Sequence, residues 1–81
     1  MTRNIHVQYF AVLREQAGRS QETRQTRAAT AAELYDEAQA EHGFALPRTM
    51  LRVAVNDEFC DWSTALEPGD RVVFIPPVAG G

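Results

Sequence analysis

The chain has 81 residues, of which 44% are hydrophobic, and a formal net charge of -3. This composition fits one small globular domain and is too apolar for a disordered chain. Basic residues form no cluster and no apolar run approaches the ~20 residues of a membrane span, so we expect no binding to nucleic acid or membrane. The single cysteine, Cys60, excludes an internal disulfide framework and a cysteine-based zinc site, and suits a reducing, cytoplasmic location.

Residues 4–13 begin with the alternation of a β-strand, which places Ile5, Val7 and Tyr9 on one face. The following "REQAGRS" contains glycine and serine and is typical of a short helical turn or loop. Residues 21–27 are polar, with two threonines, and they suit an edge strand.

A helix is predicted to begin at Thr30, because Thr30 and Glu33 form a Thr-x-x-Glu capping box. In such a box each side chain accepts a hydrogen bond from a backbone N–H that has no partner within the helix. Apolar residues then recur at helical spacing: Ala31, Leu34, Tyr35 and Ala38. Gly43 is expected to end the helix, which gives it a length of about 13 residues.

The second half of the sequence predicts three strands. Residues 51–57 alternate in polarity, and Asn56-Asp57 can adopt the positive φ angles of a hairpin that returns residues 58–62 as a short strand. Residues 68–70 form a turn, and "RVVFI" (71–75) follows with bulky residues on both faces, as in a strand at the centre of a sheet.

These elements predict a two-layer α+β domain with one main helix on one face of a mixed sheet. If the first and last strands lie side by side at its centre, the fold is a ubiquitin-like β-grasp. The opposite face, which carries Phe10 and either Val73/Ile75 or Val72/Phe74, then has no helix to cover it. An uncovered apolar face favours a protein partner, although loops folded over it would be an alternative.

Side chains with catalytic potential are scattered. His6 and His42 are far apart in the sequence, and neither lies near a ligand-like cluster, so we expect surface or helix-end roles and no metal site. Cys60 stands between aromatic residues, and packing is the expected role. Three carboxylates around the hairpin are expected to be solvated: Asp57, Glu58 and Asp61.

The C-terminus remains as a chemical group. Pro76 and Pro77 cannot extend a strand, because proline has no N–H, and the residues beyond them are small: Val78, Ala79, Gly80 and Gly81. Glycine has no Cβ, so such a tail can enter a narrow channel of another protein. There the terminal carboxylate could attack the α-phosphate of ATP. A sulfur donor or an amine could then displace AMP, giving a thiocarboxylate or an isopeptide. A chance Gly-Gly ending is the alternative.

Three segments carry a resemblance to a known family: "YFAVLRE" near the start, "VAVNDEF" at the hairpin and "LEPGDRVVFIPPVAGG" at the end. With them, all 81 residues resemble the small subunit of molybdopterin synthase, a β-grasp sulfur carrier. The final segment is the most specific of the three.

The resemblance implies a β-grasp domain at 1–75 and a Gly-Gly tail at 76–81. An E1-like adenylating enzyme would use ATP to adenylate Gly81, which would then become a thiocarboxylate. The tail would enter the large subunit of molybdopterin synthase, where its sulfur would pass to a pterin precursor. The large subunit would supply the catalytic side chains, and this chain would bind no cofactor directly. Phe10, Phe59 and Ile75 match apolar contact positions of the family, and isoleucine is smaller than the aromatic residue that relatives can carry there.

Three other functions remain open from the sequence. The chain could carry sulfur for thiazole or cysteine synthesis, because such carriers share the fold and the Gly-Gly end. It could be a ubiquitin-like modifier that forms isopeptides with target lysines. It could also be an interaction module whose tail has no chemical role. The partner that copurifies, and the effect of removing the tail, would separate these hypotheses.

Overall fold

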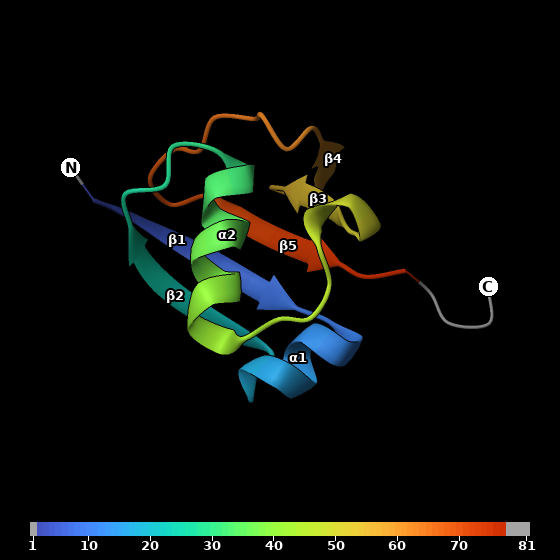
Figure 1. The fold of residues 1–81 in the computed structure, drawn as a ribbon. Coiled ribbons are helices and arrows are strands. Elements are labelled where there is room, and N and C mark those ends of the chain that lie inside the picture. Colours follow the sequence, from blue (N-terminus) through green and yellow to red (C-terminus); the bar gives the residue numbers. More distant parts are fainter. Residues whose placement is uncertain (1, 78–81) are drawn as a thin grey trace.

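Figure 1 shows the computed structural model, which describes residues 2–77. Its elements in chain order are β1 (Arg3–Tyr9), α1 (Ala11–Ala17), β2 (Gln21–Thr26), α2 (Ala31–His42), the 3-10 helix η1 (Arg48–Met50), β3 (Arg52–Val55), β4 (Glu58–Cys60) and β5 (Arg71–Ile75). The strands form one mixed sheet in the order β2-β1-β5-β3-β4, in which only the central β1–β5 pair is parallel. Helix α2 lies across one face (Figure 1). The fold is the expected ubiquitin-like β-grasp.

The hydrophobic core lies between α2 and one face of the sheet. Alternation along β1 and β5 directs Ile5, Val7, Val72 and Phe74 into it, each at most 1% exposed. The four apolar residues expected on the helix are all buried against them: Ala31, Leu34, Tyr35 and Ala38. Because Val72 and Phe74 face the core, the other face of β5 carries Val73 and Ile75.

Helix α2 begins and ends at the predicted residues. Thr30 Oγ1 accepts a hydrogen bond from the Glu33 N–H at 3.2 Å. The Glu33 carboxylate accepts from the N–H of Ala29 at 3.1 Å, one residue before the position that a standard capping box uses. Gly43 ends the helix with φ 73°, and its N–H donates to Gln39 O at 2.8 Å.

The β3–β4 hairpin turns at the expected pair, with φ 51° at Asn56 and 71° at Asp57. The Asn56 side chain also joins this turn to the start of β5. Its Nδ2 donates to Asp70 Oδ1 at 3.0 Å, and its Oδ1 accepts from the Arg71 N–H at 3.0 Å. The turn is therefore held by tertiary contacts as well as by its own backbone geometry.

Two parts of the fold differ from the sequence prediction. The first strand ends at Tyr9, and helix α1 covers residues 11–17, so it begins inside the segment 4–13 that starts as a strand and includes the first part of "REQAGRS" (14–20), for which a short helical turn or a loop was predicted. The reason is Leu13, which is fully buried and anchors α1 under the end of the sheet. The short helix η1 was not expected, and it precedes β3. Within residues 2–77, no helix is long and apolar enough to cross a membrane.

Candidate functional site

The strand from which the predicted tail leaves, β5, ends at Ile75. Its last pairing is with Arg52 of β3, and Pro76 and Pro77 follow without further pairing because neither has an N–H to donate. Ile75 is half-buried, Pro76 is buried and Pro77 is exposed. The chain therefore leaves the sheet at its centre, between β1 and β3.

Grooves lie on both sides of residues 75–77. The groove on the β1 side has a volume of ≈ 520 Å³ and is lined by Phe10, Ala11, Val12 and Leu46 together with 75–77. The groove on the β3 side has a volume of ≈ 430 Å³ and is lined by Met50 and Arg52 with the same three residues. Their linings are apolar except for Arg52, and they flank the point where the predicted tail begins.

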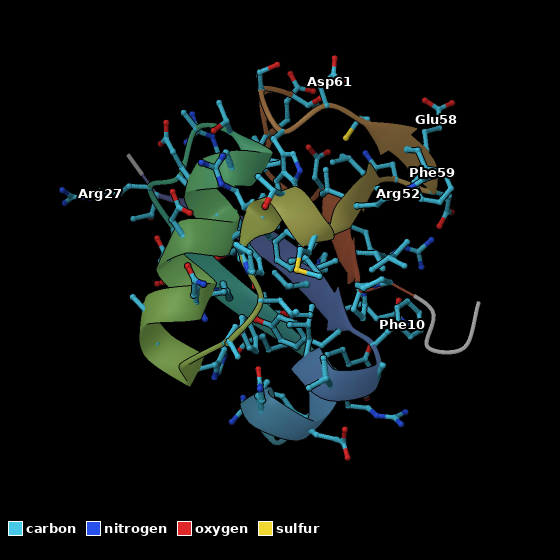
Figure 2. All side chains as sticks on the ribbon, turned by 45° about the vertical axis from the view of Figure 1, so that its right-hand side comes forward. Phe10, Arg27, Arg52, Glu58, Phe59 and Asp61 are labelled. Carbon is cyan, nitrogen blue, oxygen red and sulfur yellow. The ribbon has the colours of Figure 1, made fainter. Side chains whose placement is uncertain are left out.

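The exposed large apolar side chains gather at this end of the molecule. They are Phe10, at 41% exposed, Met50, at 53%, and Phe59, at 66%. Figure 2 shows Phe59 beside Arg52, with Phe10 on the same side of the molecule. We call the set of Phe10, Met50, Arg52, Phe59 and Ile75 the tail-root surface.

The predicted contact residues lie on this surface but not in one pocket. Phe10 and Ile75 line the same groove, whereas Phe59 lies farther out on the hairpin, opposite Ala54. Their role in binding a partner stays a prediction. The exposed apolar area of the open face is also smaller than expected, because Val73 is only 8% exposed.

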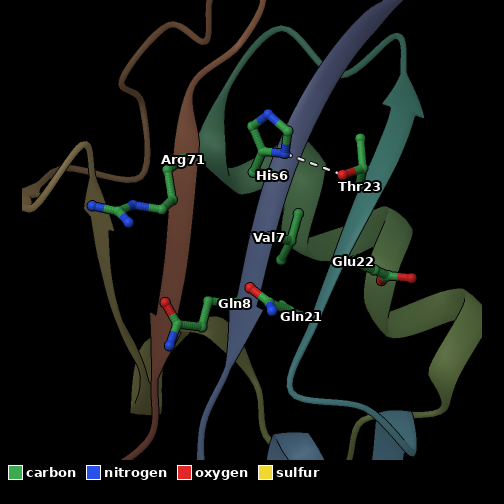
Figure 3. Close-up of a pocket in the computed structure, with 7 residues that line it drawn as sticks. All are labelled: His6, Val7, Gln8, Gln21, Glu22, Thr23 and Arg71. Atoms are coloured by element: carbon green, nitrogen blue, oxygen red, sulfur yellow. Dashed lines mark hydrogen bonds between the residues drawn. The ribbon is translucent and has the colours of Figure 1, made fainter.

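The other half of the open face is polar, as Figure 3 shows. A hollow of ≈ 350 Å³ is lined there mainly by polar side chains, among them His6, Gln8 and Thr23. His6 Nδ1 lies 3.1 Å from Thr23 Oγ1, and Arg71 pairs with Asp57 at 2.7 Å. These pairings leave the tail-root surface as the apolar part of the open face.

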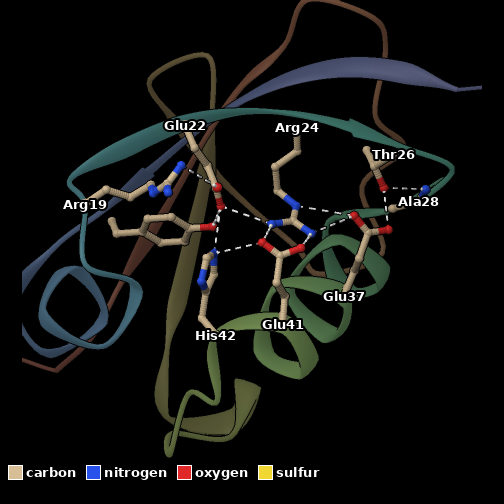
Figure 4. A network of polar contacts seen from close by, with 9 residues as sticks. Arg19, Glu22, Arg24, Thr26, Ala28, Glu37, Glu41 and His42 are labelled. Carbon is tan, nitrogen blue, oxygen red and sulfur yellow. Dashed lines mark hydrogen bonds and ion pairs between the residues drawn. The ribbon is translucent and has the colours of Figure 1, made fainter.

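A polar network joins β2 to α2 on the covered face (Figure 4). The guanidinium of Arg24 donates to three carboxylates: Glu22 at 3.1 Å, Glu37 at 3.2 Å and Glu41 at 3.1 Å. Tyr9 Oη donates to Glu22, and Nε2 of His42 lies 2.9 Å from Glu22 Oε2. Thr26 Oγ1 donates to Glu37 at 2.7 Å, so strand and helix are bonded over two turns of α2.

This network corrects the expectation that His42 stands apart from any ligand-like cluster. Glu22, Glu41 and His42 place one ligand atom each within 4.8 Å of one another. The contact could not be read from the sequence, since Glu22 and His42 are 20 residues apart and meet through the packing of β2 on α2. Arg24 already supplies a positive charge to this cluster, so its ion pairs account for the arrangement.

Burial and hydrogen bonding act on the network in opposite directions. Burial alone would raise the pKa of Glu22, but the donors around it outweigh that effect and hold the pKa below its ordinary value of 4.5. Burial together with the neighbouring Glu22 carboxylate raises the pKa of the Tyr9 hydroxyl, which therefore stays a donor. Burial would lower the pKa of Arg24, but its three carboxylates raise it. The network is thus charged and internally paired.

The other groups singled out in the sequence have ordinary surroundings. Cys60 is half-buried and packs against the core, with Sγ 3.9 Å from Val53 O. Asp57, Glu58 and Asp61 are exposed, and Asp57 is the partner of Arg71. Both results agree with the packing and solvated-turn interpretations.

A model of the ThiS family matches residues 7–81. The chain belongs to the ThiS family. The match includes the last strand, the two prolines and the terminal Gly80-Gly81.

Solved structures of three proteins are similar to this ThiS-family chain. The putative molybdopterin converting factor subunit 1 of Pyrococcus furiosus is 27% identical with a TM-score of 0.76, over 94% of this chain and 99% of that one. A molybdopterin-converting factor chain of Helicobacter pylori, solved as a complex of subunits 1 and 2, is 28% identical with a TM-score of 0.65, over 96% and 99%. SAMP1 of Haloferax volcanii, a small archaeal modifier protein, is 25% identical with a TM-score of 0.81, over 96% and 99%.

These matches confirm the resemblance to the small subunit of molybdopterin synthase, and they extend it to a ubiquitin-like modifier. The chain has the fold shared by ubiquitin-like sulfur carriers and modifiers. Val78, Ala79, Gly80 and Gly81 lie outside the described residues. The tail from Pro76 onward, its boundary with the domain at 75 and the chemistry of Gly81 therefore stay predictions.

Proposed function

We propose that this protein is the sulfur-carrying small subunit of molybdopterin synthase, with the carboxylate of Gly81 as the sulfur carrier. The observation that carries the proposal is the ThiS-family match, which runs through Gly81, in a chain similar to a molybdopterin converting factor subunit 1. The position of Pro76 and Pro77 at the end of the central strand supports it, since a chain leaving there is directed away from the sheet.

The proposed chemistry uses ATP on an E1-like adenylating enzyme and requires no cofactor on this chain. The Gly81 carboxylate attacks the α-phosphorus of ATP and pyrophosphate leaves, which gives an acyl-adenylate. Sulfur at the oxidation level of sulfide then attacks the carbonyl carbon, and the bond to AMP breaks. The resulting thiocarboxylate delivers its sulfur to a pterin precursor, toward the dithiolene of molybdopterin.

The large subunit of molybdopterin synthase is the proposed partner for this delivery, and it supplies the catalytic side chains. In the Helicobacter pylori structure, subunits 1 and 2 of molybdopterin-converting factor form a complex. The six residues 76–81 can extend at most ~20 Å, so a partner that receives Gly81 in a buried site must lie against the domain where the tail begins. The tail-root surface, with Phe10, Phe59 and Ile75, is the proposed contact area.

Intact-mass spectrometry tests the carrier chemistry. Coexpression with the adenylating enzyme and a sulfur source should shift the mass of the protein by one oxygen-to-sulfur exchange. The shift should be absent when Gly81 is deleted and present in Arg27→Gln, a control whose exposed side chain lies on the opposite side of the molecule (Figure 2). Unchanged mass for the wild type, or molybdopterin formation supported by the Gly81 deletion, would contradict the proposal.

A ubiquitin-like modifier is the second candidate, because SAMP1 of Haloferax volcanii superimposes with a TM-score of 0.81. Both functions activate the same carboxylate, and they differ in the nucleophile that displaces AMP. A modifier would leave tail remnants on target lysines, which peptide mass spectrometry detects. A carrier for thiazole or cysteine synthesis would copurify with the sulfur-accepting enzyme of that pathway.

A further inference from the structure

Four of the eight arginines form ion pairs within residues 2–77, and Arg52 is among the four that do not. Arg19, Arg24, Arg48 and Arg71 each lie within ion-pair distance of a carboxylate. Arg52 is exposed at the start of β3, and among residues 2–77 no carboxylate lies within that distance of it. Its guanidinium carbon instead lies 5.8 Å from the centroid of the Phe59 ring, within the range of a cation–π interaction.

The register of the sheet explains this position. Arg52 pairs with Ile75 across β3 and β5, and Phe59 pairs with Ala54 across the hairpin, so both side chains lie on the open face. Glu58 precedes Phe59 and, by strand alternation, points to the other face. Glu58 is thereby turned away from Arg52, as the labelled side chains of Figure 2 show, and Asp57 in the turn is paired with Arg71.

The positive charge of Arg52 lies at the edge of the otherwise apolar groove on the β3 side of residues 75–77. Its other lining residues are Met50, Ile75, Pro76 and Pro77, so Arg52 is the only charged group among them. A protein that covers this groove and Phe59 removes water from the guanidinium. Burying a cation without a partner is strongly unfavourable, so the covering protein must supply an acceptor. A carboxylate fits best, because it accepts two parallel hydrogen bonds from the fork of a guanidinium.

We propose that Arg52, seated on the Phe59 ring, binds a carboxylate of the protein that receives the tail. The inference rests on the proposed function, and it adds the chemistry of the partner's surface. That surface has an apolar depression for Phe59 with an aspartate or glutamate at its edge. The Phe59 ring restricts the guanidinium before docking, which lowers the entropy lost when the ion pair forms.

Binding to the purified large subunit of molybdopterin synthase from the same organism tests the inference, with Kd measured by titration calorimetry. Arg52→Gln should weaken binding on the order of 30-fold, and Arg52→Glu should weaken it further because like charges then meet. Arg27→Gln and Arg27→Glu are the matched controls, since they make the same charge changes on the opposite side of the molecule (Figure 2) and should change Kd by less than about twofold.

Salt dependence separates a carboxylate from a neutral acceptor such as a backbone carbonyl. The wild-type Kd should rise with ionic strength more steeply than the Kd of Arg52→Gln, because the variant lacks the ion pair. Equal slopes would overturn the inference, and so would unchanged binding by Arg52→Glu. Equal denaturant midpoints for all variants confirm that folding is unaffected.

The outcomes for the inference and for the proposed function are distinguishable. A wild-type protein that binds the large subunit, together with Arg52→Glu that binds equally well, overturns the inference alone. A wild-type protein that does not bind the large subunit, and gains no sulfur on coexpression with the adenylating enzyme, overturns the proposed function and the inference together.

Discussion

The covered face of the sheet and the tail-root surface on its open face differ in how their charged and aromatic side chains are partnered. On the covered face, Arg24 is surrounded by three carboxylates and Phe74 is fully buried among aromatic rings. On the tail-root surface, Arg52 has no carboxylate of the described residues within ion-pair distance, and Phe59 is 66% exposed. The same residue types therefore stabilise the fold on one face and remain available to a partner on the other. Whether a side chain already has a partner within the fold therefore distinguishes a stabilising residue from a candidate contact residue better than its amino-acid type does.

The largest expected effect comes from comparing two phenylalanines. Phe74 packs against Tyr35, Tyr9 and Trp62, with ring centroids 5.1 to 6.3 Å away. Phe74→Ala should cost about 3–5 kcal/mol of unfolding free energy, because it leaves a cavity in the core. Phe59→Ala should cost less than about 0.5 kcal/mol, since its ring is already in water. Chemical denaturation measures both, and a large loss for Phe59→Ala would show that its ring stabilises the fold.

Two arginines give the next comparison. Arg24→Met should cost about 2–3 kcal/mol, because it removes the buried ion-pair partner of the Glu22 carboxylate, which is 8% exposed, and leaves only the longer pair with the exposed Arg19. Arg71→Met removes an exposed pair with Asp57 and should cost at most about 1 kcal/mol. The two values come from the same denaturation experiment. Equal costs would mean that the network on the covered face is no stronger than a surface ion pair.

Acidification should weaken the covered face through Glu22. The pKa of this carboxyl is lower in the folded state than in the unfolded state, so folding releases protons at a pH between the two values. Its contribution is complete above about the ordinary value of 4.5 and is lost as the pH falls through the lower folded-state value. The stability difference between wild type and Glu22→Gln should therefore shrink on acidification.

Glu41→Gln is the control for this pH effect. The pKa of Glu41 is also lowered, chiefly by its hydrogen bond from Arg24, but its side chain is 56% exposed and solvent screens the interaction. We expect Glu41→Gln to change the pH dependence of the unfolding free energy, measured by chemical denaturation, less than Glu22→Gln does. The reverse order would indicate that Glu22 is not the carboxyl on which the network depends.

Local patterns in the sequence predicted much of this fold. Thr30 and Glu33 marked the start of α2, Asn56 and Asp57 marked the hairpin, and the apolar run at 71–75 marked the central strand. Each of these signals acts within a few residues of the structure that it specifies.

Contacts between distant segments could not be predicted in the same way. The side chains of Glu22 and His42 meet only because β2 packs beside the end of α2. The helix α1 depends on the burial of Leu13, which a search for turn residues overlooks. Likewise, alternation within residues 51–57 predicted that Arg52 lies on the opposite face of its strand from Val53. Its contact with the Phe59 ring depends on the pairing of β3 with β4, which the alternation does not specify.

The smallest expected effect concerns Ala11, which follows Phe10 at the end of β1 with φ 51°. An alanine in the left-handed region is strained by roughly 1–2 kcal/mol, and glycine there loses about 0.5–1 kcal/mol of chain entropy, so Ala11→Gly should stabilise the fold by less than about 1 kcal/mol. Ala40→Gly, at an exposed position inside α2, should instead destabilise it by about 1 kcal/mol.

Opposite signs for these two glycine substitutions would locate the strain beside Phe10, and equal losses would argue against it. One hypothesis is that the strained backbone at Ala11 orients the Phe10 ring toward the groove that both residues line. Ala11→Gly should then raise the unfolding free energy and, by allowing Phe10 other directions, lower the affinity for the large subunit. A gain in stability with no loss of affinity would mean that Ala11 strains the turn without orienting Phe10.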